Sequence, residues 1–109
     1  MNICILAGTI PRPPIIIGDG RVVKFLVTTK YRYPHNMSRE GRHAVPCTLF
    51  DPSAQLRSQL LDPQIEGGYC ECRGRIQRNS FDGQDGLRKF TTEVVVDEDS
   101  IVIHKEKRR

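Results

Sequence analysis

Residues 73–97, RGRIQRNSFDGQDGLRKFTTEVVVD, have the pattern of a β-hairpin. Two Asp-Gly pairs, which favour tight turns, lie between a polar run and the β-branched run TTEVVV. Phe81 precedes the first Asp-Gly pair and stands among polar and charged neighbours, whereas a core phenylalanine normally has apolar company. The stretch predicts two paired strands and an isolated aromatic ring beside a basic turn.

Three further strands are expected before this hairpin. Residues 2–10, 21–31 and 43–50 are apolar and β-branched, which is typical of strands. Residues 11–20 hold three prolines and two glycines and predict a loop or an irregular edge. Residues 32–42 are polar and basic and predict a long hairpin loop. In the third strand, Pro46 indicates an edge position or a bulge, because proline cannot donate a ladder hydrogen bond.

The hydrophobic period changes after the third strand. In DPSAQLRSQLL, residues 51–61, Asp51 is a natural N-cap and Pro52 suits the first helical position. Leu56 and Leu60, four residues apart, give a short amphipathic helix. Residues 67–77 and 88–97 then predict the fourth and fifth strands, and residues 101–104 a short sixth.

The order strand, strand, strand, helix, strand, strand fits the OB-fold, although other small barrels share it. The expected fold class is all-β, a five-stranded barrel with one short helix between strands 3 and 4. We expect one domain over residues 1–104 and a basic, disordered end over residues 105–109. OB barrels bind oligonucleotides or oligosaccharides across strands two and three and the adjoining loops.

Basic side chains concentrate in two separate segments, within a net charge of +4. Residues 21–42 carry six Arg or Lys against Glu40, and residues 73–90 carry five against two Asp. Residues 51–71 and 91–104 are acidic. If the two basic segments meet in space, they form a surface suited to a polyanion. The plainer alternative is ordinary solvated charge.

Composition argues against several other classes of protein. No apolar run approaches the roughly 18–20 residues that cross a membrane, and no secretory leader is recognisable, so a cytoplasmic location without a membrane partner is expected. The four cysteines lack Cys-x-x-Cys spacing and are best explained as buried, reduced thiols, with redox chemistry left open. Three scattered histidines and the lack of a phosphate-binding P-loop predict no enzymatic activity, cofactor or metal.

Several stretches together resemble bacterial single-stranded DNA-binding proteins. NICILAG resembles their first strand, GDGRVVKFLVTT the second, LFDPSAQL the strand-to-helix junction, and RGRIQRNSFDGQDGLRKFTTEVVVD the hairpin and last strand. At the junction the family often has Phe-Gly, and Asp51 replaces the glycine here. Where the family often has a tryptophan, this sequence has Ala44. The resemblance covers Asn2 to about Asp97.

The resemblance implies a function for the isolated ring. Aromatic residues at the positions of Phe81, Phe50 and Tyr33 are implied to stack on bases, which holds a strand without reading its sequence. Expected nucleic-acid-binding residues are therefore Phe81, Phe50, Tyr33, Tyr31, Lys24, Lys30, Arg32, Arg73, Arg75, Arg78, Arg88 and Lys89.

The same resemblance implies partners. It implies binding and protection of single-stranded DNA in replication, recombination or repair, by a homotetramer or homodimer associated with the nucleoid. Many relatives continue into a tail with an acidic tip that recruits replication and repair proteins, whereas this sequence ends in HKEKRR. Either the tail has been removed or the protein is a short form without that tip. The alternatives are a replication-restart (primosome-type) accessory OB subunit acting through protein partners and, further off, a carbohydrate-binding barrel.

Overall fold

The computed structural model describes residues 1–33 and 36–107, with the backbone alone for residues 31–33, 36–40 and 105–107. These residues form seven strands, one α-helix and two 3-10 turns. In chain order they are β1 (Cys4–Thr9), β2 (Ile15–Ile17), β3 (Val22–Tyr33), β4 (Asn36–Phe50), α1 (Ala54–Leu61), η1 (Pro63–Ile65), β5 (Gly68–Asp82), β6 (Arg88–Val96), η2 (Glu98–Ser100) and β7 (Val102–Lys107).

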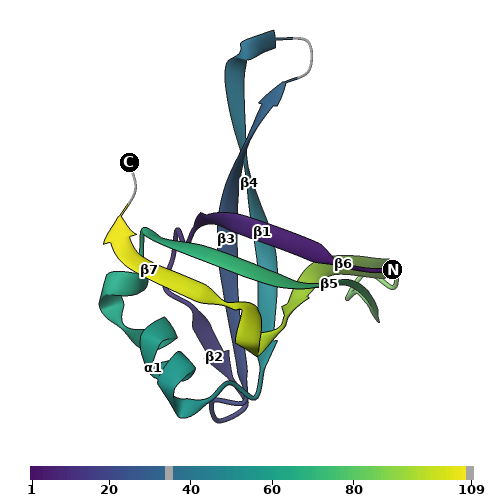
Figure 1. The fold of residues 1–109 in the computed structure, drawn as a ribbon. Helices are drawn as coiled ribbons and strands as arrows, with labels where there is room; N and C mark the ends of the chain where they lie inside the picture. Colours follow the sequence, from purple (N-terminus) through teal and green to yellow (C-terminus); the bar gives the residue numbers. More distant parts are fainter. Residues whose placement is uncertain (34–35, 108–109) are drawn as a thin grey trace.

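Five strands close into a barrel in the spatial order β1-β3-β4-β6-β5, and pairing of β1 with β5 completes the ring. The short β2 pairs with β3, and β7 pairs with β5 (Figure 1). Along the chain, helix α1 lies between β4 and β5, the third and fourth barrel strands in sequence order, and it buries Leu56 and Leu60. This is the predicted five-stranded barrel with one helix.

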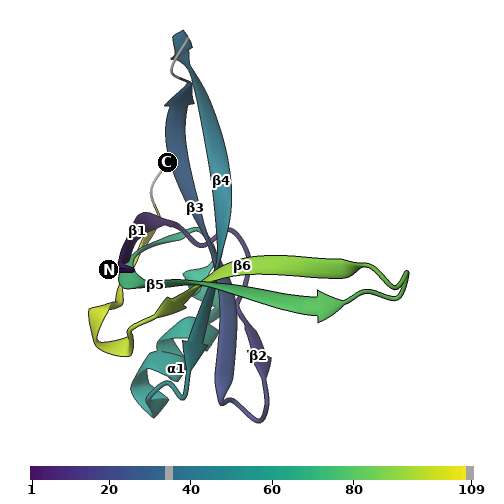
Figure 2. The same ribbon diagram turned by 90° about the vertical axis from the view of Figure 1, so that its right-hand side faces the viewer.

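Two long hairpins leave the barrel in different directions, as Figure 2 shows. The arm β3–β4 pairs from Val22↔Phe50 to Arg32↔Glu40, and the hairpin β5–β6 pairs from Gly74↔Val96 to Asp82↔Arg88. The prediction of a loop over residues 32–42 was wrong, because most of this segment belongs to the two strands of the arm. A ribbon that projects from the core needs no apolar face, so its polar composition hid the strands.

Pro46 occupies an edge position, as predicted. It pairs with Leu26 on one side, and the pairing of β4 with β6 on the other side covers only Cys47 and Thr48. The expected loop over residues 11–20 contains the short edge strand β2.

The start of α1 differs from the prediction. The N-cap is Ser53, whose Oγ accepts a hydrogen bond from Leu56 N at 3.2 Å, and not Asp51. Asp51 has φ +49°, a left-handed conformation that glycine adopts most easily and that Asp tolerates better than most residues. Asp51 therefore belongs to the turn from β4 into α1, and the helix begins two residues later than the sequence predicted.

The final strand β7 runs past His104 to Lys107, whose backbone pairs with Gly68. The expected boundary at residue 104 falls inside this strand, because the edge of β5 offers backbone partners to residues of any composition. Arg108 and Arg109 lie outside the described residues.

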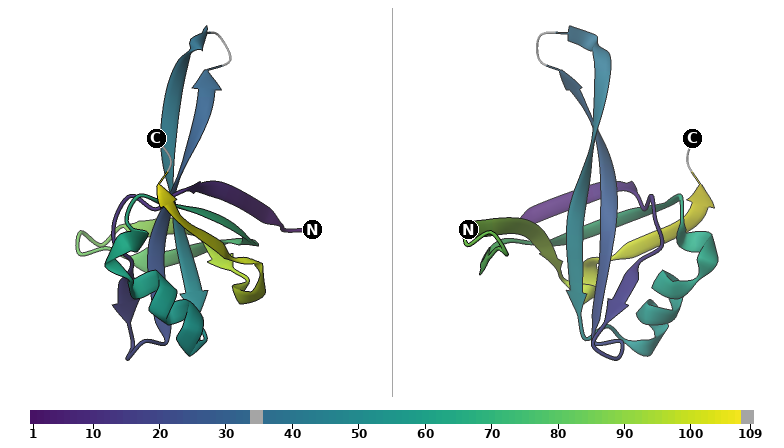
Figure 3. Two further views of the ribbon diagram at one scale, coloured as in Figure 1. Left: turned by 60° about the vertical axis from the view of Figure 1, so that its left-hand side comes forward. Right: turned by 180° about the vertical axis from the view of Figure 1, so that it is seen from behind.

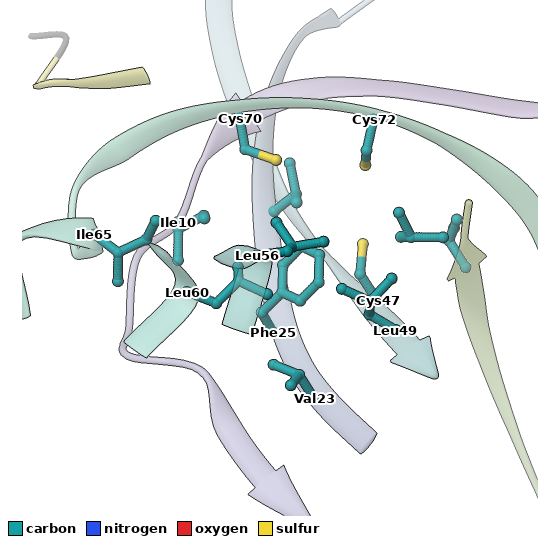
Figure 4. Close-up of a cluster of buried hydrophobic side chains, with 13 residues drawn as sticks. Ile10, Val23, Phe25, Cys47, Leu49, Leu56, Leu60, Ile65, Cys70 and Cys72 are labelled. Atoms are coloured by element: carbon teal, nitrogen blue, oxygen red, sulfur yellow. The ribbon is translucent and has the colours of Figure 1, made fainter. Parts of the chain in front are cut away.

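Buried side chains from β3, β4, β5, β6 and α1 fill the barrel, and β1 adds the partly buried Cys4 and Leu6 (Figure 4). Val23, Phe25 and Val27 share the inward face of β3. Three thiols meet in this core: Cys72 lies within hydrogen-bonding reach of both Cys47 and Cys70, and each is at most 4% exposed. The shared hydrogen bonds and burial raise the pKa of Cys47 and of Cys70, so these two sulfurs stay protonated at neutral pH.

A glycine marks the root of each projecting hairpin. A Cβ on Gly8 would overlap the Thr28 carbonyl oxygen where β1 crosses β3, and a Cβ on Gly74 would overlap the Val95 carbonyl oxygen where β5 meets β6. These close backbone approaches let the strands turn around the barrel and still carry on into the hairpins.

Candidate nucleic-acid interface

Phe81 lies on the outward face of the hairpin β5–β6. Its ring is 48% exposed, and its cross-strand neighbour is Lys89, whose Nζ lies 3.4 Å from Asp85 Oδ2. Directly paired residues of an antiparallel ladder share a face, so the ring and the ammonium group stand side by side. The ring comes two residues before the loop 83–87, in which Gly86 adopts φ +79°. A base stacked on Phe81 would therefore place its phosphate near a cation.

The opposite face of the hairpin holds a second aromatic residue that the sequence did not single out. The Arg78 guanidinium lies 4.2 Å from the centroid of the Phe90 ring, which is 54% exposed. Arg88 donates to Ser80 Oγ at 2.8 Å and forms an ion pair with Asp82 at 3.5 Å. Alternation alone puts Phe90 on the same face as the core residues Val94 and Val96, but the hairpin has left the barrel by that point.

The expected cluster around Phe81 is thus divided between two faces. Phe81 and Lys89 lie on one face, and Arg78 and Arg88 lie on the other, next to Phe90. The hairpin therefore offers a ring with cations on each side. Once the register of β5 against β6 is known, the alternation of side chains along each strand assigns the two groups to opposite faces.

Glu93 joins the hairpin to the arm. One carboxylate oxygen accepts from Thr48 Oγ1 at 2.6 Å and from Lys24 Nζ at 3.4 Å, and the other accepts from Asn79 Nδ2 at 3.2 Å. The Glu93 side chain is only 12% exposed. The hydrogen bond from Thr48, with those from Asn79 and Lys24, holds the pKa of this carboxyl below its usual range despite burial. The network fixes the outward faces of β3, β4, β5 and β6 as one continuous surface.

On the arm, this surface carries Phe50 and two of the predicted lysines. The Phe50 ring is 49% exposed at the end of β4, in register with Val22. Lys24 and Lys30 project from the same face of β3, and Arg42, which was not among the predicted residues, stands directly opposite Lys30. Phe50 and Phe81 are therefore exposed rings on the outward faces of elements that Glu93 ties together.

The remaining predicted residues are placed less centrally. Arg73 lies opposite Ile5 on the β1 side of the barrel and forms an ion pair with Asp97 at 3.5 Å, and Arg75 is exposed nearby. Tyr31, Arg32 and Tyr33 belong to β3, but their side chains lie outside the described residues. The contribution of these five residues to binding, like that of the other predicted residues, stays a prediction.

The chemistry of the surface is that of binding. It combines flat rings that can stack on bases with ammonium and guanidinium groups that can contact phosphates. Among the described side chains, no group of three or more His, Cys, Asp or Glu residues has the geometry to hold a metal ion. Within the same residues, no helix is long and apolar enough to cross a membrane.

Comparisons with known proteins agree with this architecture. The chain is 28% identical over 104 residues to the single-stranded DNA-binding protein of Clostridium tetani (strain Massachusetts / E88), a match that covers 90% of this chain and 68% of the relative. The solved structure of the Plasmodium falciparum SSB complex with ssDNA superposes with a TM-score of 0.73 at 16% identity, covering 95% of this chain and 93% of that one. No family model matches the sequence.

The barrel topology and the structural match define an OB-fold protein. Within that class, the chain is similar in sequence to one single-stranded DNA-binding protein and in fold to another.

Proposed function

We propose that this protein binds single-stranded DNA without sequence preference and protects it during replication, recombination or repair. The observation that carries the proposal is the half-exposed Phe81 ring beside Lys89, on a surface that also presents Phe50 and Lys24. Every base has a π-face, so stacking accepts any base, and cations hold the phosphates that all bases share. The similarity to two proteins whose names state this activity supports the assignment.

The binding needs no catalysis. The surface would hold the strand by stacking and phosphate contacts, which make and break no covalent bonds. We place the protein with its DNA, at the nucleoid in the cytoplasm, because that is where single strands arise during replication and repair.

We further propose that the protein acts as a homo-oligomer, a homotetramer or homodimer. The outward face of β1 and β7 exposes Ile3, Ile5 and Val102, and the Ile5 side chain is 77% exposed. The segment Cys4–Gly8 pairs with β5 on one side only, since the β1–β3 pairing covers Thr9 alone. Exposed apolar side chains along an incompletely paired strand favour association with a second copy. Sedimentation of Ile5→Lys against the unmodified protein would test this, and an unchanged mass would contradict it.

The test of DNA binding is a fluorescence-anisotropy titration of labelled oligo-dT and of a matched duplex, each at low and at high salt. We expect tight, salt-sensitive binding to the single strand and much weaker binding to the duplex, since a base pair hides the faces that stack. Equal or weak binding to both would contradict the proposal and favour an accessory subunit that bridges protein partners. The Phe81→Ala protein serves as the internal control, because its duplex binding should not change.

A further inference from the structure

The arm rises away from the barrel at the corner where β1 crosses β3 (Figure 3). A hollow lies at this corner. Its volume is about 420 Å³, and we call it the corner pocket. The residues that line it are Ala7, Gly8, Thr9, Thr28, Lys30, Arg42 and Tyr69. Since β1 and β3 pair only at Thr9↔Thr28, the strands separate on either side of that point and leave the hollow open. Sites for small ligands have volumes of this order, about 300 to 1,000 Å³.

Two cations face each other in this pocket. Lys30 and Arg42 are a directly opposed pair in the β3–β4 ladder, and both are exposed. Like charges in directly opposed positions destabilise a sheet. In the described part of the chain neither forms an ion pair with a carboxylate, whereas Lys24, Arg73, Arg88 and Lys89 all do. An anion bound between Lys30 and Arg42 would offset their repulsion.

The third feature is an aromatic ring at the end of the pocket. Tyr69 is the cross-strand partner of Thr9, so its side chain leaves β5 on the outward face and is half-buried. The ring lies at a tilt of 50° to the His104 ring, with 5.8 Å between centroids. The pocket therefore combines a cationic wall and an aromatic wall.

We infer that the corner pocket binds one nucleotide of a bound single strand, with the phosphate between Lys30 and Arg42 and the base against Tyr69. The inference rests on the proposed DNA binding and extends it. Thr28 and Lys30 lie on the same face of β3 as Lys24, so a strand crossing the face of the arm reaches the pocket without leaving that surface. A DNA strand whose base stacks on Tyr69 would then pass over the crossing of β1 and β3 toward the β1 side of the barrel.

The first test uses a mononucleotide as the probe. We expect titration of the ¹⁵N-labelled protein with thymidine 5′-monophosphate to shift the amide signals of Gly8, Thr9, Thr28 and Tyr69 in a saturable way. Inorganic phosphate at the same concentration should affect Lys30 and Arg42 and leave the Tyr69 signal in place. Shifts confined to the hairpin β5–β6 would overturn the inference, as would identical patterns for the two probes, which would indicate a simple anion site.

The second test uses variants and oligo-dT of increasing length. Tyr69→Leu should weaken binding of long oligonucleotides about 5-fold or more, the loss expected for one stacked base, and Tyr69→Phe should bind as the unmodified protein does. Lys30→Gln should weaken binding more than Arg57→Gln, which removes one positive charge from α1. Circular dichroism and melting temperature would confirm that each variant is folded.

The outcomes separate the two proposals. If the unmodified protein fails to bind oligo-dT, the proposed function is wrong and the pocket assignment falls with it. If the unmodified protein binds and folded Tyr69→Leu binds equally well, only the pocket assignment is overturned. The same holds if Tyr69→Leu changes the oligomeric state while its affinity per subunit stays the same, because Tyr69 would then be a subunit contact.

Discussion

The arm β3–β4 and the hairpin β5–β6 are both antiparallel ribbons that project from one barrel, but their cations are arranged differently. On the hairpin, Arg88 and Lys89 lie next to Asp82 and Asp85, at 3.5 and 3.4 Å. On the arm, Lys30 and Arg42 face each other without a carboxylate partner in the described part of the chain.

The difference suggests two roles. Cations held by carboxylates keep the hairpin ordered around its exposed rings, and each must give up a partner before it binds a phosphate. Unpaired cations are available at once and gain most from a phosphate. We expect the hairpin to contribute chiefly by stacking and the arm chiefly by charge.

The largest expected effects concern stability, at the roots of the two ribbons. Gly8→Ala and Gly74→Ala should each lower the free energy of unfolding by about 3 kcal/mol or more, because the new Cβ overlaps a backbone carbonyl that cannot easily move. Gly86→Ala at the hairpin tip is the matched control and should cost about 1 kcal/mol, since it has φ +79° but open space around it. Urea denaturation measures all three, and similar losses at root and tip would contradict the role of the close approaches.

Next in size is the stacking contribution of the hairpin. Phe81→Ala should weaken binding to oligo-dT by about 1–3 kcal/mol, and Phe81→Tyr should preserve most of the affinity. Leu87→Ala removes an exposed apolar side chain from the same hairpin and should have little effect. Anisotropy titrations compare the three, and a folded Phe81→Ala protein with unchanged affinity would show that the ring does not stack.

The difference in charge between arm and hairpin predicts smaller changes in affinity, which can be measured from the salt dependence of binding. Lys30→Gln should reduce the slope of log K against log salt by about 0.7, the value for one contact with a single-stranded phosphate, and Lys89→Gln should reduce it less. Asp85→Asn should tighten binding, because it releases Lys89 and keeps the oxygen that accepts from Leu87 N. Equal slopes for the two lysine variants would remove the distinction between arm and hairpin.

The smallest effect at neutral pH is expected where the two ribbons are joined. Glu93→Gln should cost about 1 kcal/mol at pH 7. Gln can still accept from Thr48, but it no longer attracts Lys24, and its NH2 group then faces the Asn79 Nδ2 donor. The folded protein lowers the pKa of Glu93, so its carboxylate stabilises the fold above the ordinary glutamate pKa. That stability is lost as the pH falls from about 4.3 through the folded-state value. Melting temperatures from pH 7 to pH 2 should therefore converge for the two proteins, and parallel curves would contradict the assignment.

Much of the fold could be predicted because its signals are local. Alternation in β3, the helix signal around Leu56 and Leu60, and the Asp-Gly pairs each depend on neighbouring residues. The arm was missed because a ribbon solvated on both faces has no hydrophobic period. The pairing of β3 with β4 beyond the barrel is visible only in three dimensions. The N-cap was misplaced because the left-handed turn at Asp51 depends on how β4 meets α1.

The candidate site was predictable in its residue types but not in its arrangement. Phe81 could be singled out because its sequence neighbours are polar and charged. Phe50 could be singled out because it matches an aromatic position of the family that the sequence resembles. Phe90 was hidden by its alternation with core valines, and the hairpin's extension beyond the barrel exposes it. Arg42 meets Lys30 through the β3–β4 ladder of the arm. Tyr69 joins them only where β1 crosses β3, a contact between residues far apart in the chain.

The three core thiols can report the opening of the barrel. Cys47 belongs to β4, whereas Cys70 and Cys72 belong to β5, so an alkylating reagent reaches all three only when the barrel opens. Their labelling rate under native conditions therefore measures the free energy of opening without any introduced probe. A ligand that binds the closed barrel slows this labelling in proportion to its occupancy, so unmodified protein and an unlabelled DNA strand are sufficient to measure an affinity.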